Sequence, residues 1–193
     1  MCHADSSHYE LAREVGAGLA RAGFTVMTGG GPGIMEAANR GAKEAGGQSV
    51  GCNISLPKEQ APNRFLDTWI GFDHFFARKV MLVKYSYAFV VMPGGFGTLD
   101  EAAEAMTLIQ TKKIEDFPVI FMGTQFWEPF RQFVRQSLLG QLTVDPADVD
   151  RVLFTDSPAD AIEAIRVAAI EKFGLAYGPP PPRRRWWLWE RPS

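Results

Sequence analysis

The chain has 193 residues, of which 46% are hydrophobic and 22% are charged, and its formal net charge is −2. This length and composition predict one globular domain with a sizeable core, and the weak charge gives no indication of nucleic-acid binding. No stretch is long and apolar enough to predict a membrane-spanning helix, and the first residues lack the order of a signal peptide, so we expect a cytoplasmic protein. Cys2 and Cys52 lack CxxC spacing and are interpreted as reduced thiols, not as a disulfide or a metal site.

The first part of the chain predicts a βαβ unit. An apolar helical pattern predicts a helix over residues 8–22, in which Gly16 and Gly18 either weaken the helix or, as we expect of a helix that faces a sheet, permit close packing. A strand at 24–28 then meets a glycine-rich loop and a second helix, and a strand at 49–54 completes a unit with a right-handed crossover and parallel strands. The loop does not fit GxGxxG, because Ile34 is the sixth position from Gly29, and no acidic residue ends the strand at 49–54. We therefore do not expect NAD.

The next segment contains a charged residue on an apolar helix. Residues 55–67 are expected to form a loop, in which Glu59 is either a surface charge or a site residue. After a strand at 68–72, a helix at 74–86 is apolar nearly all round, which indicates a buried helix or a subunit contact. Arg78 lies within the apolar arc of this helix, where an unpaired charge is costly. It must therefore meet an anion, which is either a protein carboxylate in a structural ion pair, a bound phosphate or the loop carboxylate Glu101.

Residues 88–110 are the centre of the prediction. A strand at 88–92 leads through the turn Pro-Gly-Gly-Phe-Gly-Thr into a helix, so that backbone N–H groups at the helix start can bind a phosphate. Thr98 can cap this helix, and Asp100 and Glu101 place carboxylates in its first turn. The alternative is that Glu101 only completes a capping box with Thr98. Because the loop at 29–33 also follows a strand and opens a helix, the two glycine loops predict one shared crevice.

The remaining elements predict the fold class. Strands are expected at 118–122 and 151–155, and helices at 127–139 and 158–173, the last capped by Ser157 with Pro158 in its first turn. The alternation predicts a doubly wound α/β sandwich of three layers, with ligands at the carboxyl ends of the strands. Residues 179–193 contain four Arg and one Glu. This Pro/Arg/Trp-rich tail is expected to be disordered or self-docked, or to contact a subunit, an acidic partner or a membrane surface.

Three motifs together resemble the Lonely Guy (LOG) family of cytokinin riboside 5′-monophosphate phosphoribohydrolases, which often carry the label of lysine decarboxylases. The motifs are GGGPGIMEAAN at 29–39, FFARK at 75–79 and PGGFGTLDE at 93–101, and the resemblance covers about residues 7–175. It implies a Rossmann-like nucleotide-binding domain over residues 1–178 and a homodimer or higher oligomer with sites near subunit contacts. The implied reaction is hydrolysis of the N-glycosidic bond of a nucleoside 5′-monophosphate to free base and ribose 5-phosphate, as a step of cytokinin biosynthesis.

The resemblance also implies roles for single residues. Arg78 and Glu101 would be the catalytic pair, because a carboxylate beside the anomeric carbon can stabilise an oxocarbenium-like sugar and activate water. Arg78 would anchor the phosphate or polarise the leaving base. No metal or cofactor is required. The residues implied for substrate binding are Gly29, Gly30, Gly31, Glu59, Lys79, Gly94, Gly95, Phe96, Gly97, Thr98, Leu99, Asp100 and Thr107.

One departure and one alternative accompany this resemblance. Relatives begin with a strand and a Gly-Ser-x-Arg-like loop ahead of the helix matched by residues 7–22, whereas this chain starts almost at that helix. We therefore expect the first strand, and with it part of the phosphate site, to be absent. The alternative to hydrolysis of AMP or prenylated AMP is a non-catalytic nucleotide or cofactor carrier, as molybdenum-cofactor carriers share this architecture. Lysine decarboxylation is not expected, since no lysine has a recognisable context for pyridoxal phosphate.

Overall fold

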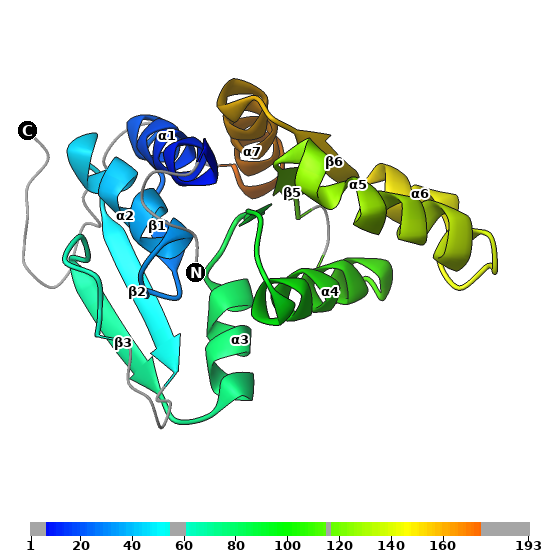
Figure 1. Cartoon of the computed structure of the whole chain (residues 1–193), viewed down its shortest axis with the longest axis horizontal. Coiled ribbons are helices and arrows are strands. Elements are labelled where there is room, and N and C mark those ends of the chain that lie inside the picture. Colours follow the sequence, from blue (N-terminus) through cyan, green and yellow to red (C-terminus); the bar gives the residue numbers. More distant parts are fainter. Residues whose placement is uncertain (1–6, 55–60, 115–116, 175–193) are drawn as a thin grey trace, which may run out of the picture.

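The computed structural model describes residues 7–54, 61–114 and 117–174, and Figure 1 shows how their elements are arranged. Helices and parallel strands alternate along the chain, as predicted. None of the helices in these ranges is long and apolar enough to cross a lipid bilayer. In chain order the elements are α1 (Ser7–Arg21), β1 (Val26–Thr28), α2 (Ile34–Glu44), β2 (Ser49–Ile54), β3 (Thr68–Phe72), α3 (Phe75–Lys84), β4 (Phe89–Val91), α4 (Phe96–Gln110), β5 (Val119–Met122), α5 (Thr124–Phe133), the π-helix η1 (Val134–Leu139), α6 (Pro146–Asp150), β6 (Val152–Thr155) and α7 (Pro158–Phe173).

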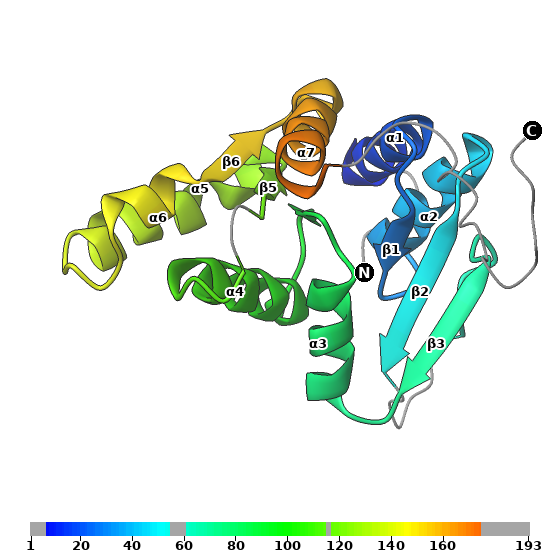
Figure 2. The ribbon, with the colours of Figure 1, turned by 180° about the vertical axis from the view of Figure 1, so that it is seen from behind.

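The strands form two sheets of three strands each. One sheet has the order β1-β2-β3 and the other β4-β5-β6, and every neighbouring pair is parallel. Figures 1 and 2 show the two sheets apart from one another, with α3 and α4 beside the space that separates them. The predicted α/β class with parallel strands is therefore confirmed, whereas the sheet is divided into two halves, with β1 and β4 as the inner edges.

The half that contains β4, β5 and β6 is covered by helices on both faces. Side chains of alternate residues along β5 point to opposite faces, since a strand has a period of two. Val119 and Phe121 pack in one cluster with residues of α4 and α5, and Ile120 and Met122 pack in another with residues of α1 and α7. All four side chains are buried. This explains the continuous apolar run of β5, because a strand buried on both faces has no polar side.

Helices α1 and α2 touch through their backbones. A Cβ at Gly16 would lie 2.1 Å from the carbonyl oxygen of Ala38, and one at Gly41 would lie 1.9 Å from that of Arg13. The predicted close packing at Gly16 is thus confirmed, and α2 contributes a second glycine to the contact.

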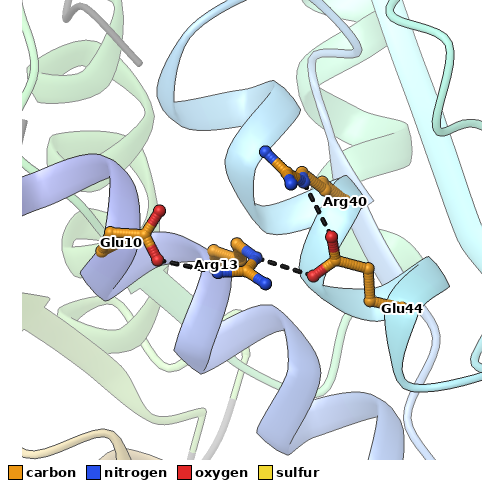
Figure 3. A network of polar contacts seen from close by, with 4 residues as sticks. All are labelled: Glu10, Arg13, Arg40 and Glu44. Atoms are coloured by element: carbon orange, nitrogen blue, oxygen red, sulfur yellow. Dashed lines mark hydrogen bonds and ion pairs between the residues drawn. The ribbon is translucent and has the colours of Figure 1, made fainter. Parts of the chain in front are cut away.

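Ion pairs flank this helix contact. Figure 3 shows Arg13 of α1 between Glu10 and Glu44, at 2.8 Å and 2.6 Å, with Arg40 at 2.8 Å from the other Glu44 oxygen. The guanidinium groups of Arg40 and Arg13 lower the pKa of the Glu44 carboxyl. Because these side chains are largely open to solvent, the pairs orient the two helices more than they stabilise the fold.

Some predicted boundaries differ from the structure. Helix α5 begins at Thr124 instead of residue 127 and gives way to η1 at Val134, and the short α6 was not predicted. The early start follows from Asp156, whose carboxylate accepts a hydrogen bond from the Thr124 N–H at 2.8 Å and another from the Thr124 hydroxyl. The predicted Ser157 cap of α7 is confirmed, since its hydroxyl accepts from the Asp160 N–H at 3.2 Å.

Candidate functional site

The space between the two halves of the sheet is a hollow of about 1600 Å³. Its walls are mostly apolar, and they come from the strands β1, β2, β3 and β4 and from the helices α1, α2, α3, α4 and α7. Both glycine loops reach it from the carboxyl ends of their strands, which is where ligands bind in open α/β sheets. The loop residues at its wall are Gly29, Pro32 and Gly33 from the first loop and Pro93, Gly94, Gly95 and Gly97 from the second.

Arg78 of α3 and Glu101 of α4 meet at the wall of this hollow. Nη2 of Arg78 donates to Oε1 of Glu101 at 2.6 Å, and the two side chains are only 15% and 21% exposed. The guanidinium also lies over the ring of Phe75, 5.5 Å from its centroid. Glu101 does not complete a capping box with Thr98, because Gly95 is the N-cap of α4 and the second carboxylate oxygen of Glu101 has no hydrogen-bond partner among the described residues.

Two polar atoms of this pair are left over. Nε of Arg78 and Oε2 of Glu101 are buried and have no hydrogen-bond partner within residues 7–54, 61–114 and 117–174. A buried polar atom without a partner is costly, and such atoms usually bond to water or to a ligand. The pair thus offers a bound molecule one donor and one carboxylate oxygen, the latter in an orientation fixed by the arginine.

Lys79, next to Arg78, makes a second link between the same helices. Its Nζ lies 2.7 Å from Oδ1 of Asp100 and 3.3 Å from Oε2 of Glu104. The hydrogen bond to Asp100 raises the pKa of the Lys79 ammonium, so that it stays charged in neutral solution. Lys79, Asp100 and Glu104 are not at the wall of the hollow. Their contacts position α3 against α4 beside the Arg78–Glu101 pair.

A buried polar network holds the first glycine loop. Nδ2 of Asn63 donates to the carbonyl oxygens of Gly30 and Gly31, at 3.1 and 3.2 Å, and to Oδ1 of Asn39 at 3.0 Å. Oδ1 of Asn39 also accepts from the Thr28 hydroxyl at 2.6 Å, which itself accepts from the Gly30 N–H at 2.9 Å. Asn39 is fully buried, and Asn63 is 8% exposed. The loop carbonyls are thereby tied into the protein, away from an anion.

The backbone of Gly30 needs both the freedom and the size of glycine. Its φ is +73°, and a Cβ there would lie 2.7 Å from the Trp69 ring. Any larger residue would strain the backbone and displace the tryptophan, so the position fixes how closely the loop can approach β2 and β3.

The second glycine loop opens α4 without a side-chain cap. Gly95 is the N-cap, and Thr98 does not bond back to the helix start, so the predicted Thr98 cap is wrong. Thr98 instead packs on Gly94, where a Cβ would lie 2.2 Å from its Oγ1. The N–H groups of Thr98 and Leu99 both bond to the Gly95 carbonyl. Those of Phe96 and Gly97 have no acceptor among the described residues, so they remain available for an anion at the positive end of the helix.

The structure brings some of the predicted site residues together and leaves others apart. Arg78, Glu101, Gly29, Gly94, Gly95, Gly97 and Thr98 share the hollow. Gly30 and Gly31 are buried in the loop behind it. Phe96 is 91% exposed, Leu99 packs against the β4–β6 core, and the exposed Thr107 donates to the Ala103 carbonyl within its own helix. Glu59 and the tail at 179–193 lie outside the described residues.

Sequence reasoning missed the residues that support the site. Asn39 lies in a matched motif, yet a lone asparagine on an apolar helix face gave no indication of its partners. Asn63 was missed because the three oxygens that its amide nitrogen contacts belong to residues more than twenty positions away. Cys52 lines the hollow and is 2% exposed, and burial raises the pKa of its thiol, so it stays a neutral, unreactive group. No group of three His, Cys, Asp or Glu within the described ranges could hold a metal ion.

Comparisons with known proteins bear on the family and the fold. A family model described as "Possible lysine decarboxylase" matches residues 35–165. The chain is 34% identical over 178 residues to the cytokinin riboside 5′-monophosphate phosphoribohydrolase of Mycobacterium tuberculosis, covering 84% of this chain and 89% of the relative. It is 28% identical over 135 residues to the rice protein named cytokinin riboside 5′-monophosphate phosphoribohydrolase LOG, covering 67% of this chain and 54% of the relative.

A solved structure extends the comparison to the fold. The Moco carrier protein from Chlamydomonas reinhardtii superposes with a TM-score of 0.63 at 26% identity, and the match covers 89% of this chain and 94% of that one. The chain therefore shares its parallel α/β architecture with a protein named as a carrier, whereas the two relatives by sequence are named as phosphoribohydrolases. The family model matches most of the chain, and so does the alignment with the mycobacterial relative. The chain therefore belongs to the LOG family, whose model is described as "Possible lysine decarboxylase".

Proposed function

We propose that this protein hydrolyses the N-glycosidic bond of a nucleoside 5′-monophosphate, releasing the free base and ribose 5-phosphate. The observation that carries the proposal is the Glu101 carboxylate, which Arg78 holds at 2.6 Å on the wall of a hollow bordered by two glycine loops. Two relatives named as cytokinin riboside 5′-monophosphate phosphoribohydrolases support the reaction class. The substrate is accordingly AMP or an AMP prenylated on its base.

The chain's own groups divide the work as follows. The free N–H groups at the start of α4 bind the phosphate, since a helix N-terminus attracts anions. The bond from the anomeric carbon to the base breaks, which leaves an oxocarbenium-like sugar. Oε2 of Glu101, which has no partner in the described structure, stabilises that charge and accepts a proton from water as the water oxygen adds to the anomeric carbon. The base leaves with the bonding electron pair and takes up a proton from solvent, and Glu101 returns the proton of the attacking water to solvent, so that one water molecule is consumed.

Arg78 has two tasks in this scheme. Its Nη2 fixes the rotamer of Glu101, and its Nε, buried and unpartnered within the described ranges, donates to the nucleotide. A guanidinium suits both, because it carries donors on several nitrogens in one rigid plane. Nε of Arg78 donates its hydrogen bond either to the phosphate or to the leaving base.

Replacing Glu101 by Gln tests the proposal. The purified chain is incubated with AMP and with isopentenyl-AMP, and free base is measured by chromatography. Glu101→Gln keeps the size of the side chain and removes its charge, so base release should fall about 10²- to 10⁴-fold while nucleotide binding persists. Glu104→Gln is the matched control, since Glu104 lies one turn further along α4 and contacts Lys79 instead of the hollow. Wild-type turnover in Glu101→Gln would overturn the assignment.

A carrier without catalysis is the second candidate, favoured by the superposition on the Chlamydomonas Moco carrier protein. A carrier needs the anion-binding loops but has less need of a carboxylate beside them. This alternative predicts saturable ligand binding by the wild-type chain with no release of base. The same assay, run together with a binding measurement, therefore separates the two candidates.

We also propose that the protein works as a homodimer through α3. Phe76 is 69% exposed and Val80 is 55% exposed, and their spacing of four places them on one face of the helix. Phe96, at the start of α4, adds a third exposed apolar side chain near the site. Covering this face would remove a contiguous apolar surface from water and bring a second subunit close to Arg78.

A further inference from the structure

A second cavity, of about 210 Å³, lies beside the outer edge of β6, and β4 and β5 separate this edge from the hollow. Its other walls come from α5, η1 and the end of α6, and Figures 1 and 2 show α5 and α6 beside β6. Val152, Leu153 and Phe154 all line it. Because successive side chains of a strand point to opposite faces, three successive residues meet one cavity along the edge of the strand. The backbone of β6 is therefore part of the wall.

The peptide groups of Val152 and Phe154 face this edge. The Phe89 N–H bonds to the Pro118 carbonyl, so the even-numbered residues of β5 bond to β4. The odd-numbered residues of β5 therefore bond to β6, and the register of this parallel pair uses the peptide groups of Leu153. Val152 and Phe154 present theirs to the opposite side, where no described strand lies. The edge thus offers two backbone N–H donors to the cavity.

Two arginine side chains line the same cavity. Arg131, near the end of α5, and Arg135, in η1, are four residues apart, a spacing at which like charges repel. Arg131 lies over the Phe154 ring, 5.4 Å from its centroid, and its ion pair with Glu128 is long, at 3.8 Å. Arg135 makes no hydrogen bond or ion pair with any described residue. The cavity therefore brings together two guanidinium groups that the protein itself hardly neutralises.

The helix that carries Arg135 is irregular at this point. The α-helical hydrogen bonding of α5 ends at Phe133, and the π-helix η1 begins at Val134. Such segments are rare, and where they occur within α-helices they are frequent at functional sites. The irregular segment thus coincides with the arginine that has no partner in the described structure.

Asp150 adds one carboxylate to the lining. It is the last residue of α6 and makes no hydrogen bond or ion pair with the rest of the described chain. A carboxylate repels a bare anion, but it accepts hydrogen bonds from hydroxyl groups. The cavity is also smaller than the roughly 300–1000 Å³ of pockets for drug-sized ligands. These features suit a small molecule with an anionic group at one end and hydroxyl groups at the other.

We propose that this cavity binds a small sugar phosphate, as a second site apart from the hollow. The phosphate contacts Arg131 and Arg135, because a guanidinium matches phosphate oxygens with parallel N–H groups. The N–H groups of Val152 and Phe154 add neutral donors to the same oxygens, and a sugar hydroxyl donates to the Asp150 carboxylate.

A titration followed by NMR tests the proposal. The full chain, labelled with ¹⁵N, is titrated at pH 7 with ribose 5-phosphate, with ribose and with inorganic phosphate. The choice of ribose 5-phosphate rests on the proposed function, which releases this compound, whereas the site does not depend on that reaction. Ribose 5-phosphate should shift the amide signals of Val152 and Phe154 and bind there at least tenfold more tightly than inorganic phosphate. Ribose should not shift them.

Substitutions separate the roles of the charged groups. Arg135→Gln should weaken the binding of ribose 5-phosphate at least tenfold and leave the unfolding temperature unchanged, because Arg135 has no contact with a described partner to lose. Arg151→Gln is the matched control, since it removes the same charge from an exposed residue next to Asp150 that does not line the cavity. Its affinity should stay within twofold of wild type. Asp150→Ala should lower the affinity for ribose 5-phosphate toward that for inorganic phosphate.

Four results would overturn the proposal. The first is shifts confined to Phe96 and Gly97 at the start of α4, which would leave the phosphate in the hollow. The second is equal weakening by Arg135→Gln and Arg151→Gln, which would indicate attraction by net charge. The third is equal affinity of the wild-type chain for ribose 5-phosphate and inorganic phosphate. The fourth is tighter binding of a hexaglutamate peptide at the β6 amides, which would make this edge a docking site for acidic segments.

The result does not depend on catalysis. The titration measures binding at β6, whereas the proposed hydrolysis is measured by release of free base. A chain that releases no base but binds ribose 5-phosphate at β6 would refute the proposed function and support this site. A chain that releases base without shifts at Val152 and Phe154 would do the reverse.

Discussion

Asn63 connects the first glycine loop to the interior of the protein. Its amide nitrogen reaches three oxygens, of Gly30, Gly31 and Asn39, from a loop that lies between β2 and β3. Since these oxygens are buried with it, the loss of the amide leaves acceptors unpaired. The loop that borders the hollow thus depends on a residue that contacts no ligand.

Replacing Asn63 by Ala should lower the free energy of unfolding by about 1–3 kcal/mol, the cost of unpaired buried polar groups. Urea unfolding followed by fluorescence measures it, and the affinity for AMP should fall in parallel because the loop loses its fixed position. Asn53→Ala is the control, since among the described residues the Asn53 side chain accepts a hydrogen bond from the next residue in its own strand and makes no other. An equal loss of stability in both variants would contradict the special role of Asn63.

At the residue scale, the sequence predicts a contact correctly where a single charged side chain lies among apolar ones. Arg78 within an apolar arc predicts an anionic partner, and the structure supplies Glu101 from the choices left open. It fails where packing decides between two roles that suit the same side chain. Thr98 has the composition of a cap, yet its hydroxyl side chain is occupied by packing on Gly94, which no local pattern encodes.

Two helices depend on a contact that admits no side chain. Gly41→Ala would place a Cβ 1.9 Å from the Arg13 carbonyl, so α1 and α2 must separate. Overpacking of this kind costs about 1–3 kcal/mol, which thermal unfolding by circular dichroism detects. Gly71→Ala in β3 is the matched control, because a Cβ there meets nothing within 4 Å. If both variants melt together, the helix contact is not as tight as the structure has it.

The hydrogen bonds from Thr124 to Asp156 at the start of α5 make part of the folding stability depend on pH. Hydrogen bonds from Thr124 lower the pKa of Asp156 from its ordinary value of 3.8. A lowered pKa means that the stabilisation is complete above the unfolded-state pKa and is lost as the pH falls through the folded-state value. Asp156→Asn should therefore reduce the urea midpoint at pH 7, and the difference from wild type should shrink below about pH 3.8.

Asp150→Asn, at the end of α6, is the matched control, since Asp150 has no part in the hydrogen bonds to Thr124. A constant difference between Asp156→Asn and wild type from pH 7 down to the acid transition would show that the carboxylate charge is not involved. Because Asp156 is exposed, the effect should also be smaller in high salt.

At the element scale, the sequence predicts what local patterns determine. The predicted strands at 49–54 and 68–72 coincide with β2 and β3, and the cap at Ser157 is where the structure has it. The start of α5 could not be predicted, since it depends on an aspartate 32 residues further along the chain. Pro129 within α5 and the π-helix that follows it break the simple 3.6-residue pattern. The end of α5 could therefore not be predicted from the sequence either.

At the scale of the whole molecule, helix α3 has no buried residue. Its apolar sequence predicts instead a buried helix or a helix at a subunit contact. If the proposed homodimer forms there, a double substitution Phe76→Lys and Val80→Lys should shift the mass measured by light scattering from dimer to monomer. Phe133→Lys on α5 is the control, since Phe133 is 52% exposed and lies on a different element. A monomeric wild-type protein, or a dimer in the double variant, would refute this interface.

At this scale the sequence predicts the class of the fold but not its division. Alternating apolar segments and glycine turns suffice for a parallel α/β sandwich, because each βα unit carries its own pattern. The separation of β1 from β4 depends on which strands become neighbours, and pairing of strands distant in sequence leaves no local trace. Two glycine loops bordering one hollow follow from the general rule for strand ends, whereas the residues that hold those loops do not.

None of the ten residues of α3, all of them described, is buried, and its side-chain links to α4 are the ion pairs of Arg78 and Lys79. Dissolved ions weaken ion pairs that are open to water and affect sheltered pairs much less. The Asp100 partner of Lys79 is 52% exposed, whereas Arg78 and Glu101 are 15% and 21% exposed. Raising the electrolyte concentration should therefore loosen the outer fastening of α3 before the inner one, so that Arg78 keeps its hold on Glu101 in salt that already weakens the link through Lys79.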